Sequence, residues 1–210
     1  MSKDNFVELS TNDDDDEITI LGLDCSSSTI GWGFTKMSDN IPALLSYGYI
    51  KPLDNKFAEI IRLDDVYKRI SELCVKLKPT FVAIEDIFLF MKGHSSAKTI
   101  TILTAFNRIA SLAAYHNSKN VFYYSVHDIR KIIGKHYNIK EKIAKEDIPD
   151  IIISKLDNRF NKTINKNGKV KKEVFDESDG IAVSLAALLQ YYNNVLNIKK
   201  TLRNKKKEKK

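Results

Sequence analysis

Three short apolar segments follow one another closely near the start of the chain, and they constrain the fold more than any other feature. They are separated by a Ser/Thr/Gly cluster and by an Asp-Asn pair, and they span Ile18–Asp24, Trp32–Met37 and Leu44–Ile50. Short apolar runs bounded by turn residues are typical of β-strands. Strands joined by so few residues pair antiparallel, because parallel neighbours need a crossover of about a dozen residues or more. We therefore expect an antiparallel three-stranded meander.

Beyond this meander the chain alternates between helical and extended patterns. Apolar residues recur three and four apart from Phe57 to Leu77 and stop before Pro79, which predicts an amphipathic helix. Two more strands are expected at Phe81–Glu85 and Val121–Ser125. Further helices are expected over Ser95–His116, 127–134, 141–156 and Ser178–Leu196. The order predicts an α/β protein with a five-stranded mixed sheet, made of three antiparallel strands and then alternating helices and strands, flanked by helices.

The length and the cysteine content indicate one intracellular domain. With 210 residues the chain can bury a sizeable core without disulfides. The two cysteines, Cys25 and Cys74, form no CxxC or Cys/His cluster, which fits a reducing compartment and does not suggest zinc. The N-terminus has no basic region followed by an apolar stretch, and no apolar run is long enough to span a bilayer. We expect a soluble protein with no membrane partner.

Charge is distributed unevenly along the chain, whose net charge is +7. Residues 1–17 hold seven acidic residues against one lysine, whereas residues 199–210 hold eight basic residues against one glutamate. We expect a disordered acidic segment over 1–17, one domain over 18–200 and a disordered basic tail over 201–210. The basic body and tail favour a polyanionic partner. A solvated tail kept for solubility explains the tail alone equally well.

A basic insertion precedes the last expected helix. The stretch "KTINKNGKVKKEV" carries an Asn-Gly pair flanked by alternating apolar and polar residues, which is a strong β-hairpin signal. We expect an exposed basic β-ribbon or a flexible loop over about 157–175.

Four acidic residues stand at the ends of the expected elements. Asp24 ends the first strand, Glu85 ends the fourth, and Asp176 and Asp179 stand near the start of the last helix. Strand ends of neighbouring strands lie side by side, and helix residues three apart project to the same side. Carboxylates gathered in this way repel one another unless a cation neutralises them, and oxygen ligands suit Mg²⁺ or Mn²⁺. The implied chemistry is phosphodiester hydrolysis by two metal ions about 3.5–4 Å apart.

Each of these acids also has a purely structural interpretation. Asp24 precedes "SSST" and could form an Asx-turn or a cap. Glu85 could be a surface residue where its strand ends. Asp176 and Asp179 could complement the N-terminal dipole of the last helix. It is the joint occurrence of the four acids that favours the metal site.

Three motifs resemble those of RuvC-type Holliday-junction resolvases, which belong to the ribonuclease H-like superfamily. They read "ILGLDCSSSTIGWG", "VAIEDIF" and "FDESDGIAVSLAAL", and the resemblance extends over about residues 18–196. It implies a ribonuclease H-like fold, a homodimer and Mg²⁺-dependent paired hydrolysis of four-way DNA junctions. The protein would then be a crossover junction endodeoxyribonuclease that takes part in DNA recombination and repair. Mn²⁺ is expected to substitute for Mg²⁺, with two ions in each active site.

The resemblance also assigns roles to individual residues. It implies that the catalytic metal ligands are Asp24, Glu85, Asp176 and Asp179. Phe88 matches an aromatic residue that contacts unstacked bases at the junction centre. The segment "VHDIRKIIGKHYNIKEK" resembles a stretch with two functional lysines, which places near the scissile phosphates Arg130 or Lys131 and then the catalytic Lys142.

Two further lysines flank a short loop before the second expected helix. Lys92 and Lys98 enclose Gly93-His94-Ser95-Ser96, whose backbone N–H groups could contact a DNA phosphate. A plain helix cap explains the same loop. The second helix also carries the expected dimer contacts, which are Ile100, Leu103, Phe106, Ile109 and Leu112. The alternative is that this whole face is intramolecular core.

The chain departs from the family pattern in two places. Cys25-Ser26 replaces the Pro-Gly of the first motif, and Lys155–Phe175 is longer than the bacterial form. A viral, phage or organellar relative would fit these departures. We expect the protein in the cytoplasm or at the nucleoid, or in the host cytoplasm or organelle matrix for a viral or organellar relative.

Other functions remain open at this point. A different ribonuclease H-like nuclease would act on branched DNA, on an RNA/DNA hybrid or on pre-rRNA. A catalytically inactive DNA-binding module would need none of the four acids. The stretch "LDCSSSTIGWG" also resembles the phosphate-binding turn of actin-like ATPases and sugar kinases, but that fold needs two such domains and the chain is too short for them.

Overall fold

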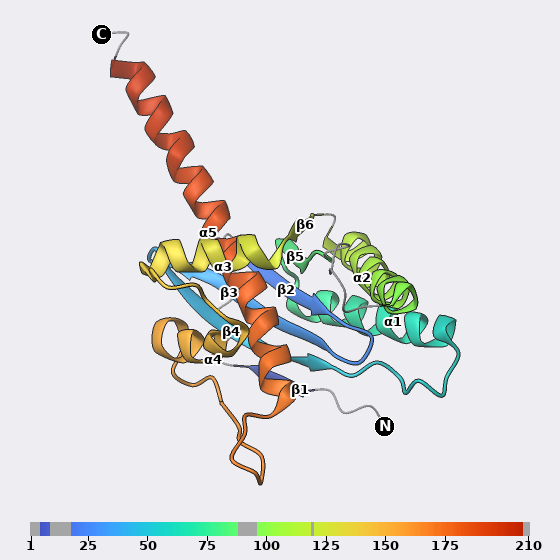
Figure 1. The fold of residues 1–210 in the computed structure, drawn as a ribbon. Helices are drawn as coiled ribbons and strands as arrows, with labels where there is room; N and C mark the ends of the chain where they lie inside the picture. Colours follow the sequence, from blue (N-terminus) through green and yellow to red (C-terminus); the bar gives the residue numbers. More distant parts are fainter. Residues whose placement is uncertain (1–4, 9–17, 88–95, 119, 208–210) are drawn as a thin grey trace.

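A six-stranded mixed sheet runs through the molecule (Figure 1). The computed structural model describes residues 5–8, 18–87, 96–118 and 120–207. The strands in chain order are β1 (Asn5–Glu8), β2 (Thr19–Cys25), β3 (Ile30–Ser38), β4 (Ile41–Ile50), β5 (Phe81–Glu85) and β6 (Val121–Tyr124). Their order in the sheet is β1-β4-β3-β2-β5-β6. The pairs β1–β4, β4–β3 and β3–β2 are antiparallel, and the pairs β2–β5 and β5–β6 are parallel.

Two tight turns build the predicted meander. Between β2 and β3, the Ser26 hydroxyl accepts a hydrogen bond from the Thr29 amide at 3.0 Å and donates one to the Thr29 carbonyl at 2.7 Å. Between β3 and β4, Asp39 and Asn40 both have positive φ, 51° and 65°. Two such residues form the connection whose twist matches that of an antiparallel pair, and Asn and Asp tolerate it well. The antiparallel meander is confirmed.

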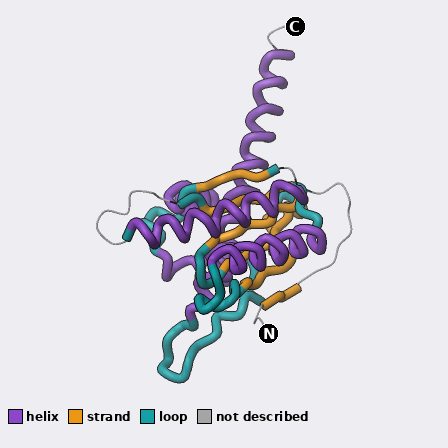
Figure 2. The backbone as a smooth tube through the Cα atoms, turned by 90° about the vertical axis from the view of Figure 1, so that its right-hand side faces the viewer, coloured by secondary structure: helices purple, strands orange, loops and turns teal. Residues whose placement is uncertain are grey.

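Helices cover both faces of the sheet (Figures 1 and 2). One face carries α1 (Glu59–Leu77) and α2 (Ala97–Ser118), and α1 ends where Lys78 turns left-handed before Pro79. The other face carries α3 (Val126–Tyr137), α4 (Ile148–Ile151) and α5 (Lys172–Lys207). Short 3₁₀ and π turns, η1 (Lys145–Asp147) and η2 (Ile152–Leu156), extend α4 at both ends.

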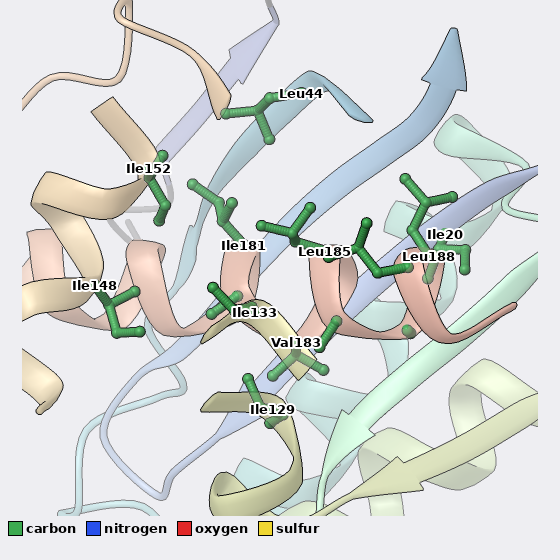
Figure 3. Close-up of a cluster of buried hydrophobic side chains, with 14 of the residues drawn as sticks. Ile20, Leu44, Ile129, Ile133, Ile148, Ile152, Ile181, Val183, Leu185 and Leu188 are labelled. Atoms are coloured by element: carbon green, nitrogen blue, oxygen red, sulfur yellow. The ribbon is translucent and has the colours of Figure 1, made fainter. Parts of the chain in front are cut away.

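Each layer of helices has its own hydrophobic core. The core between the sheet and the helices α1 and α2 includes Leu21, Leu23 and Trp32 of the strands and Val66, Ile70 and Phe106 of the helices. On the opposite face, side chains from α3, α4 and η2 converge on α5 and the sheet (Figure 3). These include Ile20, Ile129, Ile133, Ile148, Ile152, Ile181 and Leu185. The five strands and the flanking helices predicted from the sequence are therefore confirmed.

The expectation of a disordered N-terminal segment is wrong for Asn5–Glu8. These residues form β1 and pair with Ser46–Tyr49 of β4. The physical reason is that β4 would otherwise end the sheet with unpaired backbone groups, which bind an extended segment readily. Four residues are too few to show a strand period in the sequence. The other residues of the expected acidic segment, 1–4 and 9–17, lie outside the described residues.

The last helix is longer than expected at both ends. It begins at Lys172 instead of Ser178, because Val174 is buried and anchors its first turn. It continues to Lys207, so the expectation of a disordered tail is wrong for residues 201–207. Lysine, arginine and leucine favour helix, which allows α5 to continue past the body of the molecule (Figures 1 and 2). Within the described residues, each helix is too polar or too short to cross a lipid bilayer.

Candidate active site

Four carboxylates from three elements gather at one edge of the sheet. Asp24 is the penultimate residue of β2 and Glu85 is the last residue of β5. These strands are parallel neighbours with Leu23 opposite Ile84, so both acids leave the sheet at the same edge. Asp176 and Asp179 stand in the early turns of α5, which packs across β2 and β3. The structure thus brings together all four acids expected from the sequence.

Glycines allow α5 to lie directly on the strands. Gly31 is the residue opposite Asp24 in the β2–β3 ladder, and a Cβ atom there would overlap the carbonyl oxygen of Asp176. A Cβ atom on Gly180 of the helix would likewise collide with the backbone of Trp32. Backbone therefore meets backbone at this crossing, with no side chain between them. This contact holds the helical pair of acids beside Asp24.

Buried hydroxyl groups fix the position of α5 along its axis. The Thr35 hydroxyl of β3 lies 2.5 Å from the Ser184 hydroxyl, and Ser184 donates a hydrogen bond to the Ile20 carbonyl at 3.0 Å. Both side chains are completely buried. Buried polar groups that lose their hydrogen-bond partners cost free energy. Sliding of α5 along the sheet would break these hydrogen bonds and is therefore unfavourable.

Side chains from the opposite face hold the two strand ends. Arg62 of α1 donates to the Ser27 carbonyl at 2.5 Å and to the Leu53 carbonyl at 2.9 Å, and its guanidinium lies over the ring of Phe106. Asn107 of α2, fully buried, donates to the Glu85 carbonyl at 2.8 Å. The turn after β2 and the end of β5 are therefore both tied to the α1–α2 layer.

Burial and mutual repulsion raise the pKa of the acids. Burial raises the pKa of Asp24 to about 7, and the nearby charges of Asp179 and Asp176 add to the effect. Burial and the charge of Asp24 raise the pKa of Glu85 to about 8. Burial also raises the pKa of Asp179 and of Asp176. Such a cluster costs free energy when it is ionised, unless a cation compensates it.

Lys145 supplies one cation to the cluster. Its ammonium nitrogen lies 2.5 Å from a carboxylate oxygen of Asp179, and its charge opposes the rise in the pKa of Asp24 and Glu85. Sequence reasoning missed this residue and expected Lys142. A signal was present, because Lys145 precedes the buried Ile148 and Ile152 by three and seven residues, the spacing of one helix face.

The other basic residues expected at the site line a larger cavity beside the acids. This cavity has a volume of ≈ 590 Å³ and lies between the ends of β2 and β5, the start of α3 and the segment after α3. Among its lining residues are Arg130, Lys131 and Lys142, and the last two are exposed. A second cavity of ≈ 200 Å³ is lined by Asp24, Glu85, Asp179, Lys145 and Arg130. Arg130 is therefore the basic residue shared by both cavities.

Three further DNA contacts were predicted from the sequence, and the structure describes one of them, Lys98. Lys98 is exposed in the first turn of α2 and lines neither cavity. Phe88 and Lys92 lie outside the described residues.

The apolar row expected on α2 as a dimer surface is divided by the structure. Phe106 is completely buried in the intramolecular core, so the expectation that it forms a dimer contact is wrong, because the sheet covers this side of the helix. Ile109 packs against the same core, and Leu103 lines the larger cavity. Leu112 remains 44% exposed.

The donor chemistry of the cluster fits a hard divalent cation. All donors are carboxylate oxygens, and one buried oxygen of Asp176 has no hydrogen-bond partner among the residues that the structure describes. In the part of the chain that the structure describes, no three His, Cys, Asp or Glu side chains close around a single point as a metal cage. The ammonium group of Lys145 neutralises Asp179 in this arrangement.

Solved structures with the same arrangement of elements support the fold assignment. Thermus thermophilus RuvC in complex with Holliday junction substrate gives a TM-score of 0.62 at 15% identity, covering 83% of this chain and 95% of that one. The yeast mitochondrial Holliday junction resolvase gives 0.58 at 13% identity, covering 84% of this chain and 82% of that one. These likenesses show the ribonuclease H-like fold that was predicted.

Sequence comparisons identify the family. Crossover junction endodeoxyribonuclease RuvC from Orientia tsutsugamushi (strain Boryong) is 28% identical over 169 residues, which is 80% of this chain and 93% of the relative. The Legionella pneumophila protein of the same name is 33% identical over 59% of this chain and 67% of its own length. The family model described as crossover junction endodeoxyribonuclease RuvC matches residues 20–153, more than half of the chain. The protein therefore belongs to the RuvC family.

Proposed function

We propose that this protein is a structure-selective endonuclease that resolves four-way DNA junctions by hydrolysing phosphodiester bonds. One observation carries the proposal: in a chain of the RuvC family, Asp24, Glu85 and Asp179 line one cavity, with Asp176 close to Asp24, beside a larger cavity that Arg130, Lys131 and Lys142 also line. The name of that family describes endonucleases that act on crossover junctions. A solved structural neighbour, T. thermophilus RuvC, is described in complex with a Holliday junction.

The residues that would hold metal are Asp24, Glu85, Asp176 and Asp179. Bound among these carboxylates, two Mg²⁺ ions, or Mn²⁺ in their place, would supply an activated water and stabilise the leaving oxygen. The raised pKa of Asp24 and of Glu85 supports this assignment, as does the buried Asp176 oxygen that finds no hydrogen-bond partner within the described part of the chain. The backbone contact at Gly31 and Gly180 holds the two halves of the ligand set together.

The basic residues would bind the DNA strand that is cut. Arg130 lines both cavities, so its guanidinium can hold the phosphate next to the acids. Lys131 and Lys142, on the exposed rim, would bind flanking phosphates of the same strand. Lys145, beside Asp179, is the lysine best placed to donate a hydrogen bond to the scissile phosphate. We extend the proposal to Lys98, which would contact a phosphate further from the cut.

A cleavage assay tests this function directly. The purified protein is incubated with Mg²⁺ and labelled four-way junction, flap, duplex and RNA/DNA hybrid, with the Asp24→Asn variant as the control for contaminating nucleases. Preferential symmetric cutting of the junction is expected. Preferential cutting of the flap or of the hybrid would contradict the proposal and identify another ribonuclease H-like nuclease. Binding to the junction without cutting would indicate an inactive DNA-binding module.

Two coordinated cuts require two active sites, so we propose that a homodimer is the active species. A four-way junction has two-fold symmetry, which a two-fold dimer matches most simply. On α2, Leu112 and Tyr115 are 44% and 55% exposed, and these apolar side chains are candidates for the contact. Light scattering of the protein with and without junction, together with cleavage of a cruciform plasmid, tests the dimer. A monomer on the junction, or nicked circles without linear product, would contradict it.

The proposed reaction also bears on location. Junction DNA is the substrate, so we propose that the protein acts in the cytoplasm or at the nucleoid. For a viral or organellar source, the corresponding place is the host cytoplasm or the organelle matrix.

A further inference from the structure

A basic hairpin leads directly into the helix that carries two of the site's acids. It is the segment 157–171, called here the basic arm, and it extends away from the sheet in both views of the fold (Figures 1 and 2). Its two sides are joined by an antiparallel bridge between Ile164 and Val170, and the Lys171 amide donates to the Thr163 carbonyl at 3.0 Å. The insertion predicted from the Asn-Gly signal is thus a hairpin.

The tip and the base of the basic arm are both held by specific contacts. At the tip, the Asn165 side chain accepts hydrogen bonds from the amides of Asn167 and Lys169, and Gly168 has φ of 74°. At the base, Phe160 is 3% exposed and its ring centroid lies 5.1 Å from that of Tyr47. The arm is therefore an organised projection attached to the core.

The charge of the basic arm is entirely positive beyond its base. Between Lys162 and Glu173 there is no acid, and four lysines lie there: Lys166, Lys169 and Lys171 of the arm and Lys172 at the start of α5. Lys162 is paired with Asp150 at 2.6 Å, and Glu173 is paired with Lys51 at 2.8 Å. Each of the four lysines is exposed, and within the described residues none of the four forms an ion pair. Glu173 and Asp176 offset part of the charge of Lys171 and Lys172, whereas Lys166 and Lys169 lie near the tip, where like charges favour binding of an external anion.

We propose that the basic arm binds the sugar-phosphate backbone of a duplex arm of the branched DNA substrate, outside the catalytic cavities. The inference rests on the proposed junction-cleaving function and adds a second contact surface to it. Lysine and asparagine side chains suit phosphate oxygens, and such contacts fix position and register on DNA without reading its sequence. The arm would therefore orient one duplex relative to the acids.

The length of the chain limits the distance of this contact from the cut. Asp176 lies one helical turn beyond Lys172, about 6 Å along α5. The extended residues between the tip and the helix add at most about 10 Å. The sum is an upper limit for the distance along the chain, and it corresponds to about five base pairs at about 3.4 Å each.

Site-directed crosslinking tests the location of the contact. The chain's two cysteines, Cys25 and Cys74, are both buried, so Asn167→Cys would place the most accessible thiol at the tip. This variant is labelled with a thiol-reactive photocrosslinker and irradiated on a four-way junction. We expect crosslinks on one pair of symmetry-related duplex arms, one arm for each protomer, within about seven base pairs of the cut. Crosslinks spread evenly over all arms, or none at all, would overturn the proposal.

Charge removal tests the energy of the contact. The variant Lys166→Gln, Lys169→Gln, Lys171→Gln is compared with a matched control of equal charge, Lys56→Gln, Lys68→Gln, Lys76→Gln, whose residues are exposed on and before α1. Both sets are made in the Asp24→Asn background, so that binding is measured without cutting. In the arm variant we expect the slope of log affinity against log salt to fall by about two to three units, because each lost phosphate contact removes about 0.9. Equal slopes for arm variant and control would overturn the proposal.

The two proposals fail in distinguishable ways. If the wild-type protein cuts junctions but the arm variant binds like the control, the basic arm has no role in DNA binding and the proposed function stands. A second outcome is that the wild-type protein cuts no junction, while the slope of log affinity against log salt falls in the arm variant and not in the control variant. In that case the arm binds DNA and the proposed function is wrong. Thermal unfolding of each variant checks that the fold is retained.

Discussion

The two faces of the same strands are built from different kinds of residues. On the face toward α1 and α2, β2 and β3 present large apolar side chains, which are Leu21, Leu23, Ile30, Trp32 and Phe34. On the face toward α5, the alternate positions nearest the site carry small or polar residues, which are Gly22, Asp24, Gly31, Gly33 and Thr35, whereas Ile20 and Met37 further along the strands join the core on that face. Successive residues of a strand point to opposite faces, so the same strands serve two purposes. Both faces bury apolar area, and only the α5 face also brings a helix backbone close enough to assemble a site.

The difference implies that the two faces respond differently to mutation. Changes under α1 and α2 reduce apolar burial and lower the stability of the whole domain. Changes under α5 also shift Asp176 and Asp179 relative to Asp24 and Glu85. Cleavage per folded molecule should therefore depend on the α5 face far more than on the α1 face.

The largest effect is expected from the acids themselves. Asp24→Asn, Glu85→Gln, Asp176→Asn and Asp179→Asn should each lower single-turnover cleavage by more than about 100-fold, because metal-assisted hydrolysis needs its ligands. Junction binding should survive, since affinity comes mainly from phosphate contacts. Cys74→Ala under α1 is the control and should cut normally. A rate above a few per cent of wild type in Asp24→Asn would contradict the metal assignment.

The next effect separates the position of α5 from the stability of the domain. Gly180→Ala inserts a methyl group where the helix backbone meets Trp32, and should cost about 1–3 kcal/mol together with most of the cleavage activity. Ile70→Val, in the core under α1, should cost about 0.5–1.5 kcal/mol and leave cleavage per folded molecule unchanged. Chemical denaturation and single-turnover rates measure the two quantities. Equal loss of activity in both variants would mean that the two faces do not differ in this way.

A third test uses pH, because the acids near α5 include Asp24 and Glu85, whose pKa values are strongly raised. The pKa of Asp24 is about 7 and that of Glu85 about 8 in the folded protein, above their ordinary values of 3.8 and 4.5. Between the ordinary and the raised values the folded state binds more protons than the unfolded state, so stability falls as pH rises. Without divalent metal, the melting temperature should decrease from about pH 5 to about pH 8 through this cluster.

Substitutions at the site and added Mg²⁺ should each change the pH dependence of the melting temperature. Asp24→Asn should flatten it, whereas Ile70→Val should lower the curve without changing its shape. Mg²⁺ should stabilise the protein more at pH 8 than at pH 5, because ligands must be ionised to bind it. If the melting temperature of the wild-type protein varied with pH as little as that of Asp24→Asn, ionisation of these acids would not destabilise the folded state.

The smallest effect is expected where α5 has left the sheet. Removing residues 199–210 deletes eight basic residues and should flatten the salt dependence of DNA binding without moving the cut sites. Flexible or projecting lysines steer a polyanion but do not select a phosphodiester bond. An unchanged slope of log affinity against log salt would show that this part of α5 does not contact DNA.

Periodicity and turn chemistry were sufficient to predict most of the fold. The Asp-Asn pair at residues 39–40 predicted its turn because these residues accept positive φ, and Pro79 marked the end of α1. The early start of α5 was not predictable, since it depends on tertiary burial of Val174. The strand at Asn5–Glu8 also depends on tertiary structure, because its hydrogen-bond partners are on the edge strand β4. It could therefore not be predicted from the local sequence.

The acids were predictable and one of their cations was not. Asp24 and Glu85 follow apolar strands, so their position at a sheet edge could be inferred from sequence. Lys145 stands in a segment whose helix begins four residues later than expected at residue 141, and that shift changes which lysine faces inward. Lys142 was expected from the resemblance of its segment to a family motif, and the sequence had no comparable motif to indicate that Lys145 pairs with Asp179.

β1 has a consequence for how the protein behaves in concentrated solution. It satisfies the outward backbone groups of Ser46–Tyr49, in a strand that also contains Leu44, Leu45 and Ile50. A chain shortened past Glu8 would present this ten-residue aromatic and aliphatic strand as a free template, and extended segments of other molecules add readily to such templates. Pairing of Asn5–Glu8 with β4 thus protects against self-association, and removal of these residues should promote fibrous or amorphous aggregates whose formation high salt does not suppress.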